Sequence, residues 1–447
     1  MKSFFNTLSN IFKIPELRDR IIFTIVLIAV YRLGSYIILP GIDTAQLQLL
    51  FEQQSGSGIL GFINTFVGGA FARGSIFALG IMPYISASII VQLLTAALPS
   101  LQKMSKEGES GQRKINQITR YLTVIITTAQ GAGYIVNMKQ QYGGAILDTS
   151  SMFWLTSIFI LSAGTMFLVW MGERITDKGI GNGVSLIITI GIIADLPAAL
   201  ITEAQLNPIM IFYVELIALG IVTMGVVALT IAVRKVPVNY ARRMVGNKMM
   251  GGMMPSVRQY IPLKLNAANV MPIIFAQALM FLPATVAQFF PTSDFWQATG
   301  SAFSDWTSVP YNLVFALLII LFTYFYTSIT VNPGDIADQL KRNGGFIPGV
   351  KPGKKTSEHI DTILTRITLP GSIFLALVAV FPAFAATFGV TQSFAQFFGG
   401  TSLLIMIGVV LDTLQQIESY LLMRHYDGLM KSGRMKGRVS SAATLTQ

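Results

Sequence analysis

Residues 75–94 read SIFALGIMPYISASIIVQLL, and they form the most informative segment of this chain. The segment contains no charged side chain, and a helix needs about 20 mostly apolar residues to cross a bilayer. Within it, Pro83 predicts a kink that frees a backbone acceptor, and Gln92 places an amide at lipid depth, where it requires a partner. The segment therefore predicts a membrane-spanning helix that moves against its neighbours, with ordinary helix packing as the alternative.

Nine further segments of comparable length and hydropathy flank this one. The composition agrees, because 52% of the 447 residues are hydrophobic and only 12% are charged, against about 25% in soluble proteins. This composition disfavours a soluble enzyme. The ten predicted spans are 21–38, 75–98, 117–137, 152–171, 184–201, 209–233, 267–290, 311–331, 369–388 and 401–423.

The predicted fold class is an all-α membrane protein. Ten spans divide into two sets of five, and an odd number in each set gives the halves opposite orientations, which is the topology of an inverted repeat. The tenth span is the least regular, because Asp412 and Glu418 interrupt it, and an interfacial helix is the alternative there. We expect an N-terminal half at 1–202, a C-terminal half at 203–425 and a cytoplasmic tail at 426–447.

The distribution of basic residues predicts the orientation. The chain has 32 Lys and Arg against 21 Asp and Glu, a formal net charge of +11. If both termini are cytoplasmic, 29 of the 32 basic residues lie on the cytoplasmic side, as the positive-inside rule requires. The first 20 residues lack the apolar core of a signal peptide, so we expect them to remain in the protein. Topology thus accounts for most of the charge without a nucleic-acid ligand.

Two predicted cytoplasmic loops, 234–264 and 332–367, are longer than a connection requires. The first has seven basic residues and no acidic one. A basic loop of this kind binds either an anionic lipid surface or a partner protein. Interleaved apolar residues such as Val236, Val238 and Tyr260 favour a folded hairpin, and we therefore favour partner docking.

Residues 55–73, SGSGILGFINTFVGGAFAR, are apolar and rich in glycine but too irregular for a full span. Irregular backbone at membrane depth is tolerated only inside protein or along a water-filled cavity. The segment predicts an element that folds back into the membrane-embedded part of the molecule, and an interfacial location is the alternative.

The chain offers little catalytic or metal-binding chemistry. It has no cysteine and only two histidines, His359 and His425, which lie far apart in sequence without metal-ligand spacing. Residues 349–355 superficially resemble a phosphate-binding loop, but three residues separate the glycines instead of four. We therefore expect no catalytic residue, no metal and no cofactor.

Charged residues within the spans bear on the choice between transport classes. Arg32 and Glu215 are the clear cases, and both lie near enough to a span end to snorkel. A small-solute secondary transporter normally has an ionisable site at the bilayer midplane, and the sequence offers none. That transporter is the alternative function, and a scaffold that only anchors partners is a third.

Six motifs in a fixed order resemble the SecY family of protein-conducting channels. The similarity extends over residues 12–438, nearly the whole chain. Residues 75–94 and the stretch WMGERITDKGIGNGVSLII at 170–188 resemble the two family signatures. The other four motifs are YRLGSYIILPGID (31–43), EGESGQRKINQITRY (107–121), NPGDIADQLKRNGGFIPGVKPG (332–353) and GGTSLLI (399–405).

The resemblance implies two inverted five-helix halves around a central hourglass pore. Unfolded secretory proteins would pass through it, and membrane segments would leave it sideways. A ring of aliphatic side chains at the waist gates by dewetting and holds no charge that traps a passing chain. Val184 is one methylene smaller than the isoleucine common in the family. Motif by motif, this waist ring is Ile81, Ile85, Val184, Ile188, Ile274 and Ile405.

The resemblance also implies a plug and a lateral gate. The plug helix, at about residues 58–73, would fill the outer vestibule, which gives the glycine-rich segment a purpose. The lateral gate would lie between the second and seventh spans, with Gln92 and Asn266 as its polar positions. The apolar residues implied for the plug are Ile59, Leu60, Phe62, Ile63 and Phe66.

Partners and location are implied in the same way. The two long loops match docking sites for the motor SecA and the ribosome, with Arg242, Arg243 and Lys351 as contacts. Lys351 departs from the usual arginine, because lysine keeps the charge but lacks the planar fork of a guanidinium. SecE-like and SecG-like subunits, signal sequences of precursor proteins and membrane lipid complete the expected partners, with no sequence-specific nucleic acid. The implied location is the bacterial inner membrane.

Overall fold

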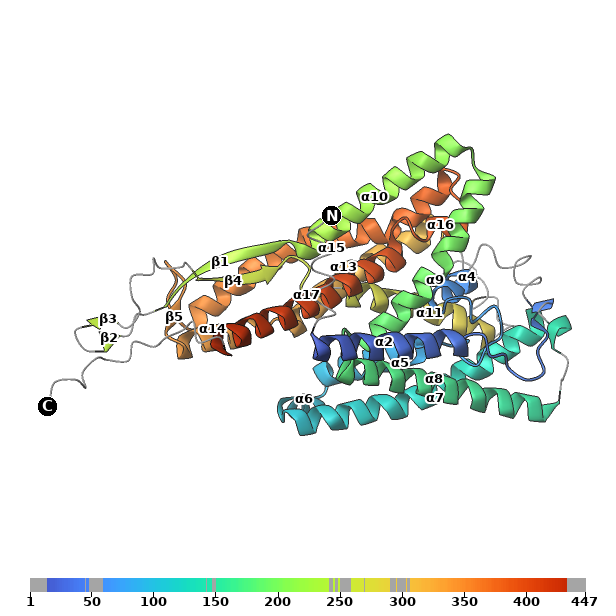
Figure 1. Ribbon diagram of the computed structural model, residues 1–447, viewed down its shortest axis with the longest axis horizontal. Coiled ribbons are helices and arrows are strands. Elements are labelled where there is room, and N and C mark those ends of the chain that lie inside the picture. The colour runs from blue at the N-terminus through green and yellow to red at the C-terminus, as the bar shows by residue number, and fades with distance from the viewer. Residues whose placement is uncertain are drawn as a thin grey trace.

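The chain folds into a bundle of long helices with a small β-sheet at one end (Figure 1). Each of the ten predicted spans corresponds to a helix. The helices are α2 (Pro15–Gly34), α5 (Met82–Ala97), α7 (Glu109–Gln141), α8 (Ser151–Lys178), α9 (Gly183–Leu206), α10 (Ile209–Ile231), α11 (Met271–Phe289), α13 (Val309–Thr330), α15 (Lys354–Thr387) and α17 (Gly400–Lys431). The computed structural model describes residues 14–44, 46–47, 59–141, 143–146, 150–240, 244–245, 248–249, 259–268, 270–289, 295, 303 and 306–431.

Within these described residues, six helices are long and apolar enough to cross a membrane by themselves: α8, α9, α10, α13, α15 and α17. A seventh span is obtained if α5 and the short α6 (Pro99–Lys106) are counted as one broken helix. The remaining helices are more polar or shorter in their apolar part. Residues 271–280, for example, form the apolar stretch of α11.

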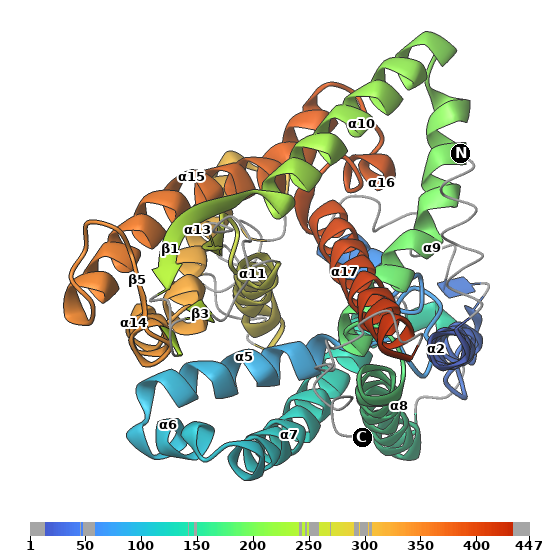
Figure 2. The same cartoon turned by 60° about the vertical axis from the view of Figure 1, so that its left-hand side comes forward.

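The helices surround a central region in which α11 and α17 lie (Figure 2). On one side, α5 packs against α7, and α7 packs against α8. On the other side, α11 packs against α13, and α13 packs against α15. The two sets come from opposite ends of the sequence, as expected for a two-part bundle.

Short polar side chains determine where several helices begin. Asn182 accepts a hydrogen bond from the Ser185 N–H (3.3 Å), and Ser150 accepts one from the Phe153 N–H (3.3 Å). Each satisfies a backbone donor that has no partner inside the helix.

The predicted kink at Pro83 is absent. Residues 76–81 form turns, and Pro83 lies at the first positions of α5, where its missing N–H costs no hydrogen bond. The predicted second span therefore begins later than expected. Its bend lies at the other end, where α5 and α6 meet at 100° around Leu98 and Pro99.

The two long loops fold together outside the bundle. The predicted hairpin is confirmed: β1 (Val233–Tyr240) pairs antiparallel with β4 (Gln259–Lys264). The second loop then contributes β5 (Gly345–Phe346), which pairs with the end of β1. Figure 1 shows this sheet beside α14 (Pro333–Arg342) at one end of the molecule. The shared core of this unit comprises Val236, Val238, Leu263, Leu340, Ile347, Ile360 and Leu364.

Short elements complete the fold. The helix α4 (Ile59–Phe66) precedes a run of turns, and α16 (Gln392–Ala395) lies between α15 and α17. A single 3-10 turn, η1 (Gly143–Ala145), follows α7. Two short strands, β2 (Met244–Val245) and β3 (Lys248–Met249), pair with each other.

Candidate pore, plug and gate

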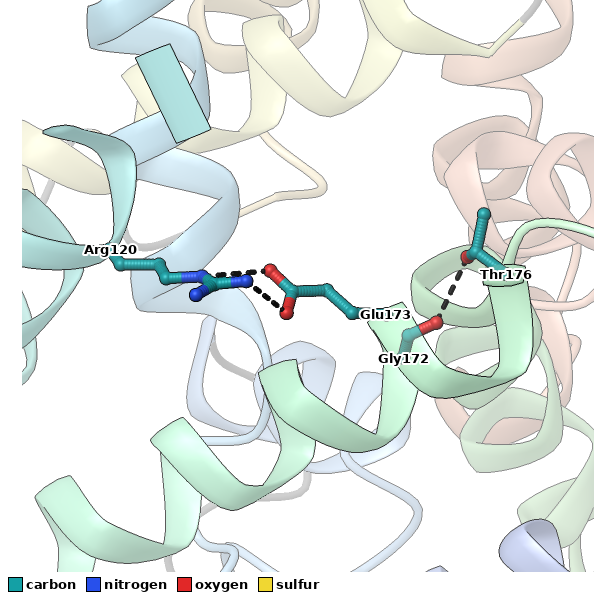
Figure 3. A network of polar contacts seen from close by, with 4 residues as sticks. All are labelled: Arg120, Gly172, Glu173 and Thr176. Carbon is teal, nitrogen blue, oxygen red and sulfur yellow. Dashed lines mark hydrogen bonds and ion pairs between the residues drawn. The ribbon is translucent and has the colours of Figure 1, made fainter. Parts of the chain in front are cut away.

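The second signature forms a tight junction between α8 and α9. Gly172 and Gly183 approach so closely that a Cβ on Gly183 would lie 2.0 Å from the Gly172 carbonyl oxygen. The Thr176 hydroxyl donates to Gly172 O (2.9 Å, Figure 3) and accepts from the Gly183 N–H (2.9 Å). A Cβ on Gly172 would lie 2.9 Å from a methyl of Val184. The glycines therefore make room for one member of the waist ring.

The turn between α8 and α9, residues 179–182, is also held by other helices. The Ile180 N–H donates to Thr24 Oγ1 of α2 (3.1 Å). The Gly181 N–H donates to Gln416 Oε1 of α17 (2.9 Å). Backbone groups at this turn are thus satisfied by side chains from the first and the last helix, which fixes the start of α9.

The six waist-ring residues lie at or near the beginnings of four helices, α5, α9, α11 and α17. Ile188 and Ile405 belong to one buried apolar cluster, and Ile85, Val184 and Ile274 pack against that cluster. Ile81 belongs to an adjoining cluster, against which Ile85 and Val184 also pack. The structure therefore brings all six aliphatic side chains into one continuous apolar region.

The segment predicted as a plug begins with α4. The last residue of α4, Phe66, belongs to the same apolar cluster. Phe66 is 7% exposed and is a member of the cluster that contains Ile188 and Ile405. Val67, which follows it, is 2% exposed. The plug therefore packs directly against the waist-ring region. The other four predicted plug residues have their backbone in α4, and their side chains lie outside the described part: Ile59, Leu60, Phe62 and Ile63.

Hydrogen bonds from three long side chains hold the backbone after α4. The Tyr31 hydroxyl donates to Val67 O (3.2 Å) and the Arg32 guanidinium donates to Gly68 O (3.3 Å). From α7, the buried Tyr134 hydroxyl donates to Phe71 O (2.9 Å). Carbonyl groups that no regular secondary structure satisfies thus obtain donors from neighbouring helices.

Two glycines let this segment approach α9. Gly191 of α9 has no room for a side chain, because a Cβ there would lie 2.6 Å from Phe66 O. Gly68 has a φ of +64°, a conformation that glycine adopts without steric cost. At the end of the segment, the Arg73 guanidinium lies 4.4 Å from the centre of the Tyr36 ring. The plug is therefore bound to α9 by backbone contact.

The predicted gate lies where α5 meets α11. Ile89 of α5 belongs to the same buried apolar cluster as Ile273 of α11. Gln92 donates through Nε2 to Ser88 Oγ of its own helix (3.2 Å), and Asn266, just before α11, is 4% exposed. Buried apolar side chains therefore pack together where the gate is predicted.

The corner between α9 and α10 is bound by a buried carboxylate. Glu203 is fully buried, and its Oε2 accepts from the Thr391 N–H (3.2 Å) and from the Thr391 hydroxyl. Asn207 Nδ2 donates to the other carboxylate oxygen (2.5 Å). Because Thr391 precedes α16, this carboxylate joins the last turn of α9 to the segment between α15 and α16.

A bidentate ion pair joins α7 to α8 beside the signature junction. Arg120 Nε and Nη2 donate to Glu173 Oε1 (3.0 Å) and Oε2 (2.6 Å), respectively (Figure 3). The pair borders a cavity of about 340 Å³ that Arg174 and Asp177 also line. The two arginines face two carboxylates, so the lining carries no net charge. The ion pair between Arg120 and Glu173 therefore positions α7 against α8.

Of the three predicted docking residues, the structure describes only Lys351. Arg242 and Arg243 lie outside the described residues. Lys351 is exposed in the loop after β5, and its carbonyl oxygen accepts from Thr356 Oγ1 (3.0 Å). Among the described residues, no group of histidine, cysteine or acidic side chains could hold a metal ion.

The sequence did not identify the residues that hold the plug. The sequence could have pointed to Tyr31 and Arg32, because both begin the YRLGSYIILPGID motif and a charge inside a span is unusual. Tyr134 and Gly191 had none, since a tyrosine and a glycine within long helices are common. Their roles become visible only when α4 is placed beside α7 and α9.

Comparisons with known proteins show the family and the fold of the chain. The model of the SecY family matches residues 75–414. A protein translocase subunit SecY of Streptomyces scabiei is 42% identical over 435 residues, which cover 94% of this chain and 98% of that protein. The corresponding subunit of Escherichia coli strain K12 is 41% identical over 431 residues, covering 94% and 96%.

Solved structures share the fold. One described as "The structure of a protein conducting channel" aligns with a TM-score of 0.63 at 16% identity, over 90% of this chain and 92% of that one. Sec61 in the canine ribosome-channel complex aligns with a TM-score of 0.59, with the same identity and coverage. At this identity, the likeness concerns the fold.

Proposed function

The chain belongs to the SecY family, and from that membership we infer that it is the channel subunit of a protein translocase. Its function is to conduct unfolded polypeptides across a membrane and to release apolar segments into it. The chain itself performs transport and not catalysis. The energy for directional movement is then supplied by a partner.

We propose that the polypeptide passes through the waist ring. The observation that carries this proposal is the packing of Ile188, Ile405 and Phe66 in one apolar cluster, with Ile85 and Val184 packed against it. Aliphatic side chains exclude water and ions when they meet, and they offer a passing chain no specific partner. Such a ring seals at rest and yields to any sequence.

We propose the plug and gate as the two moving parts. Tyr31, Arg32 and Tyr134 hold the plug by hydrogen bonds to its carbonyl groups, so the plug returns to a defined position. A signal helix would enter between α5 and α11. It gains about 1.5–3 kcal/mol for each large apolar side chain that it buries, which offsets the apolar contacts that the gate loses. In this proposal the halves are residues 1–202 and 203–425.

We propose the bacterial inner membrane as the location. The β-sheet unit and both termini would lie on the cytoplasmic side, because the basic residues of the chain are concentrated in these segments. The unit formed by β1, β4, β5 and α14 supports docking of a SecA motor or a ribosome, with Arg242, Arg243 and Lys351 as contacts. SecE-like and SecG-like subunits would cover exposed apolar helix faces. Among the six membrane-spanning helices of the described residues, α10 has the smallest buried share.

Reconstitution tests the function. The chain is purified with its SecE-like partner, placed in vesicles and supplied with a SecA-type motor, ATP and a radiolabelled precursor. Protease-protected precursor inside the vesicles is the expected result. If the vesicles instead accumulate a small solute without the motor, and protect no precursor, the small-solute transporter replaces this proposal.

A further inference from the structure

A small polar cavity lies in the second half of the bundle, between α11, α13, α15 and the start of α17. Its volume is about 40 Å³. The polar side chains that line it are Gln277, Tyr311, Asn312, Gln396 and Thr401. Apart from these, its walls are mostly apolar. Four of the five polar side chains, those other than Asn312, are buried.

Pro382 accounts for the position of the cavity. It lies inside α15, where a proline cannot donate to the carbonyl one turn back. The chain before α17 packs into this irregularity: a Cβ on Gly399 would lie 2.7 Å from Val378 O, and one on Gly400 would lie 2.9 Å from Pro382. The start of α17 is thereby held beside the cavity.

One lining atom has an unmet need for a partner. Thr401 is 2% exposed, and no group in the described part of the chain lies within hydrogen-bonding reach of its Oγ1. A threonine deeper in a helix donates to the carbonyl four residues earlier, as Thr413 does to Val409 O (2.7 Å). Thr401 follows Gly400, the first residue of α17, and has no such helical carbonyl behind it. Burying a hydroxyl without a partner costs about 1–3 kcal/mol.

The cavity also connects two elements that move in the proposed function. Gln277 is on α11, the gate helix, is 5% exposed and hydrogen-bonds the Tyr311 hydroxyl. Gln396 is on the opposite wall, and its Oε1 accepts from Thr65 Oγ1 of the plug helix (2.9 Å). That bond leaves the amide nitrogen of Gln396, with two donors, for the cavity.

We propose that this cavity is a binding site for internal water, and that the bound water links the plug helix to the gate helix. A buried water needs roughly 10–15 Å³ of such space and two to four polar partners. The volume of about 40 Å³ therefore admits about three or four molecules. Water there satisfies Thr401 Oγ1 and bridges Gln396 to Gln277. Displacing the plug removes Thr65 from Gln396 and so changes the hydrogen bonding of the gate helix.

The water site is tested on the assembled complex in lipid nanodiscs by high-resolution cryo-electron microscopy. Ordered density within hydrogen-bonding distance of Thr401 Oγ1 and Gln396 is expected, and T401V should remove it. The control T323V alters a buried threonine of α13 that donates to Ile319 O (2.6 Å), outside the cavity, and should leave the density in place. A dry cavity, at a resolution that resolves other buried waters, overturns the proposal.

The link rests on the proposed function and is tested by a double-mutant cycle. T65V, Q277L and their combination are compared by resting ion conductance of the complex in planar bilayers. The effects of substitutions at coupled residues do not add. The factor by which T65V raises the conductance should therefore be at least about threefold smaller in the Q277L variant than in the unmodified complex. Equal factors in both backgrounds overturn the link. The water density is read without any transport, so its outcome is separate from failure of the channel function.

Discussion

Two junctions between elements of the bundle are held by different kinds of contact. At the corner between α9 and α10, the buried Glu203 accepts hydrogen bonds from Thr391 and Asn207. At the gate, α5 and α11 meet through apolar residues such as Ile89 and Ile273, and the hydrogen bond of Gln92 stays within α5. Directional hydrogen bonds therefore hold the corner at Glu203, whereas apolar packing of Ile89 and Ile273 holds α5 against α11.

The difference suggests which side opens. A buried carboxylate that loses its donors is left desolvated and unpaired, which is costly. Apolar surfaces that part can be covered again by any apolar helix at little net cost, since the hydrophobic effect is non-directional. We therefore assign the Glu203 side as the hinge and the Ile89 side as the gate. The plug belongs to the hinge side, because its backbone packs on Gly191 of α9.

The largest effect should come from locking each side in turn. The variant I89C/I273C, joined by a flexible bismaleimide, should lower precursor translocation by about tenfold or more, because the gate cannot part. The variant E203C/T391C, joined in the same way, should retain most of the activity. Protease-protected precursor in vesicles is the readout. Equal inhibition by the two crosslinks would remove the distinction between hinge and gate.

Crowding the plug should have the next largest effect. In Gly191→Ala the new Cβ lies 2.6 Å from Phe66 O, and overpacking of this kind costs about 1–3 kcal/mol. The plug is then displaced at rest, and the resting ion conductance of the complex should rise by about tenfold. The matched control is Gly220→Ala on α10, where a Cβ meets nothing within 4 Å. A silent Gly191→Ala variant would show that the plug does not depend on α9.

Removing the hinge carboxylate should lower stability without blocking the gate. Glu203→Ala leaves the half-buried Thr391 N–H without its acceptor and should lower the free energy of unfolding by about 1–3 kcal/mol. Thermal unfolding of the purified complex measures this. Glu358→Ala is the control, because its ion pair with Lys355 (3.2 Å) is solvent-exposed and worth about 0–1 kcal/mol. If Glu203→Ala and Glu358→Ala lower the melting temperature equally, the Glu203 carboxylate does not stabilise the corner between α9 and α10.

The smallest effect is expected at the gate itself. Gln92→Leu removes a bond to Ser88 worth about 0.5–1.5 kcal/mol and makes the α5 face more apolar. The gate then closes more firmly, and translocation of precursors with weak signal sequences should fall by a few fold. Ser88→Ala removes the same bond without adding apolar surface, so a similar fall there would assign the effect to the bond alone.

Local patterns in the sequence predict much of this fold. Runs of about 20 apolar residues correspond to ten helices because a helix satisfies its own backbone at membrane depth. The β1–β4 hairpin is also local and was predicted correctly. Pro83 was placed inside a helix and lies at its start, because proline is compatible with both positions and only the preceding turns distinguish them.

Contacts between distant segments carry no local signal. The pairing of β5 with β1 joins Gly345 to Tyr240, and a two-residue strand has no pattern of its own. The plug anchors act over 36 residues for Tyr31 and 63 for Tyr134. Family resemblance supplied the waist ring, the plug and the gate, and the side-chain contacts that hold the plug required the structure.

The central claim is that polypeptide passes through the waist ring, and crosslinking tests it most directly. The chain has no cysteine, so I274C reports on one position. A precursor that carries one cysteine is arrested in transit and the complex is oxidised. The control is A228C, exposed on α10 away from the waist ring. The account predicts a disulfide to the precursor in I274C and none in A228C. A correctly inserted, partner-bound I274C complex with no such crosslink would contradict it.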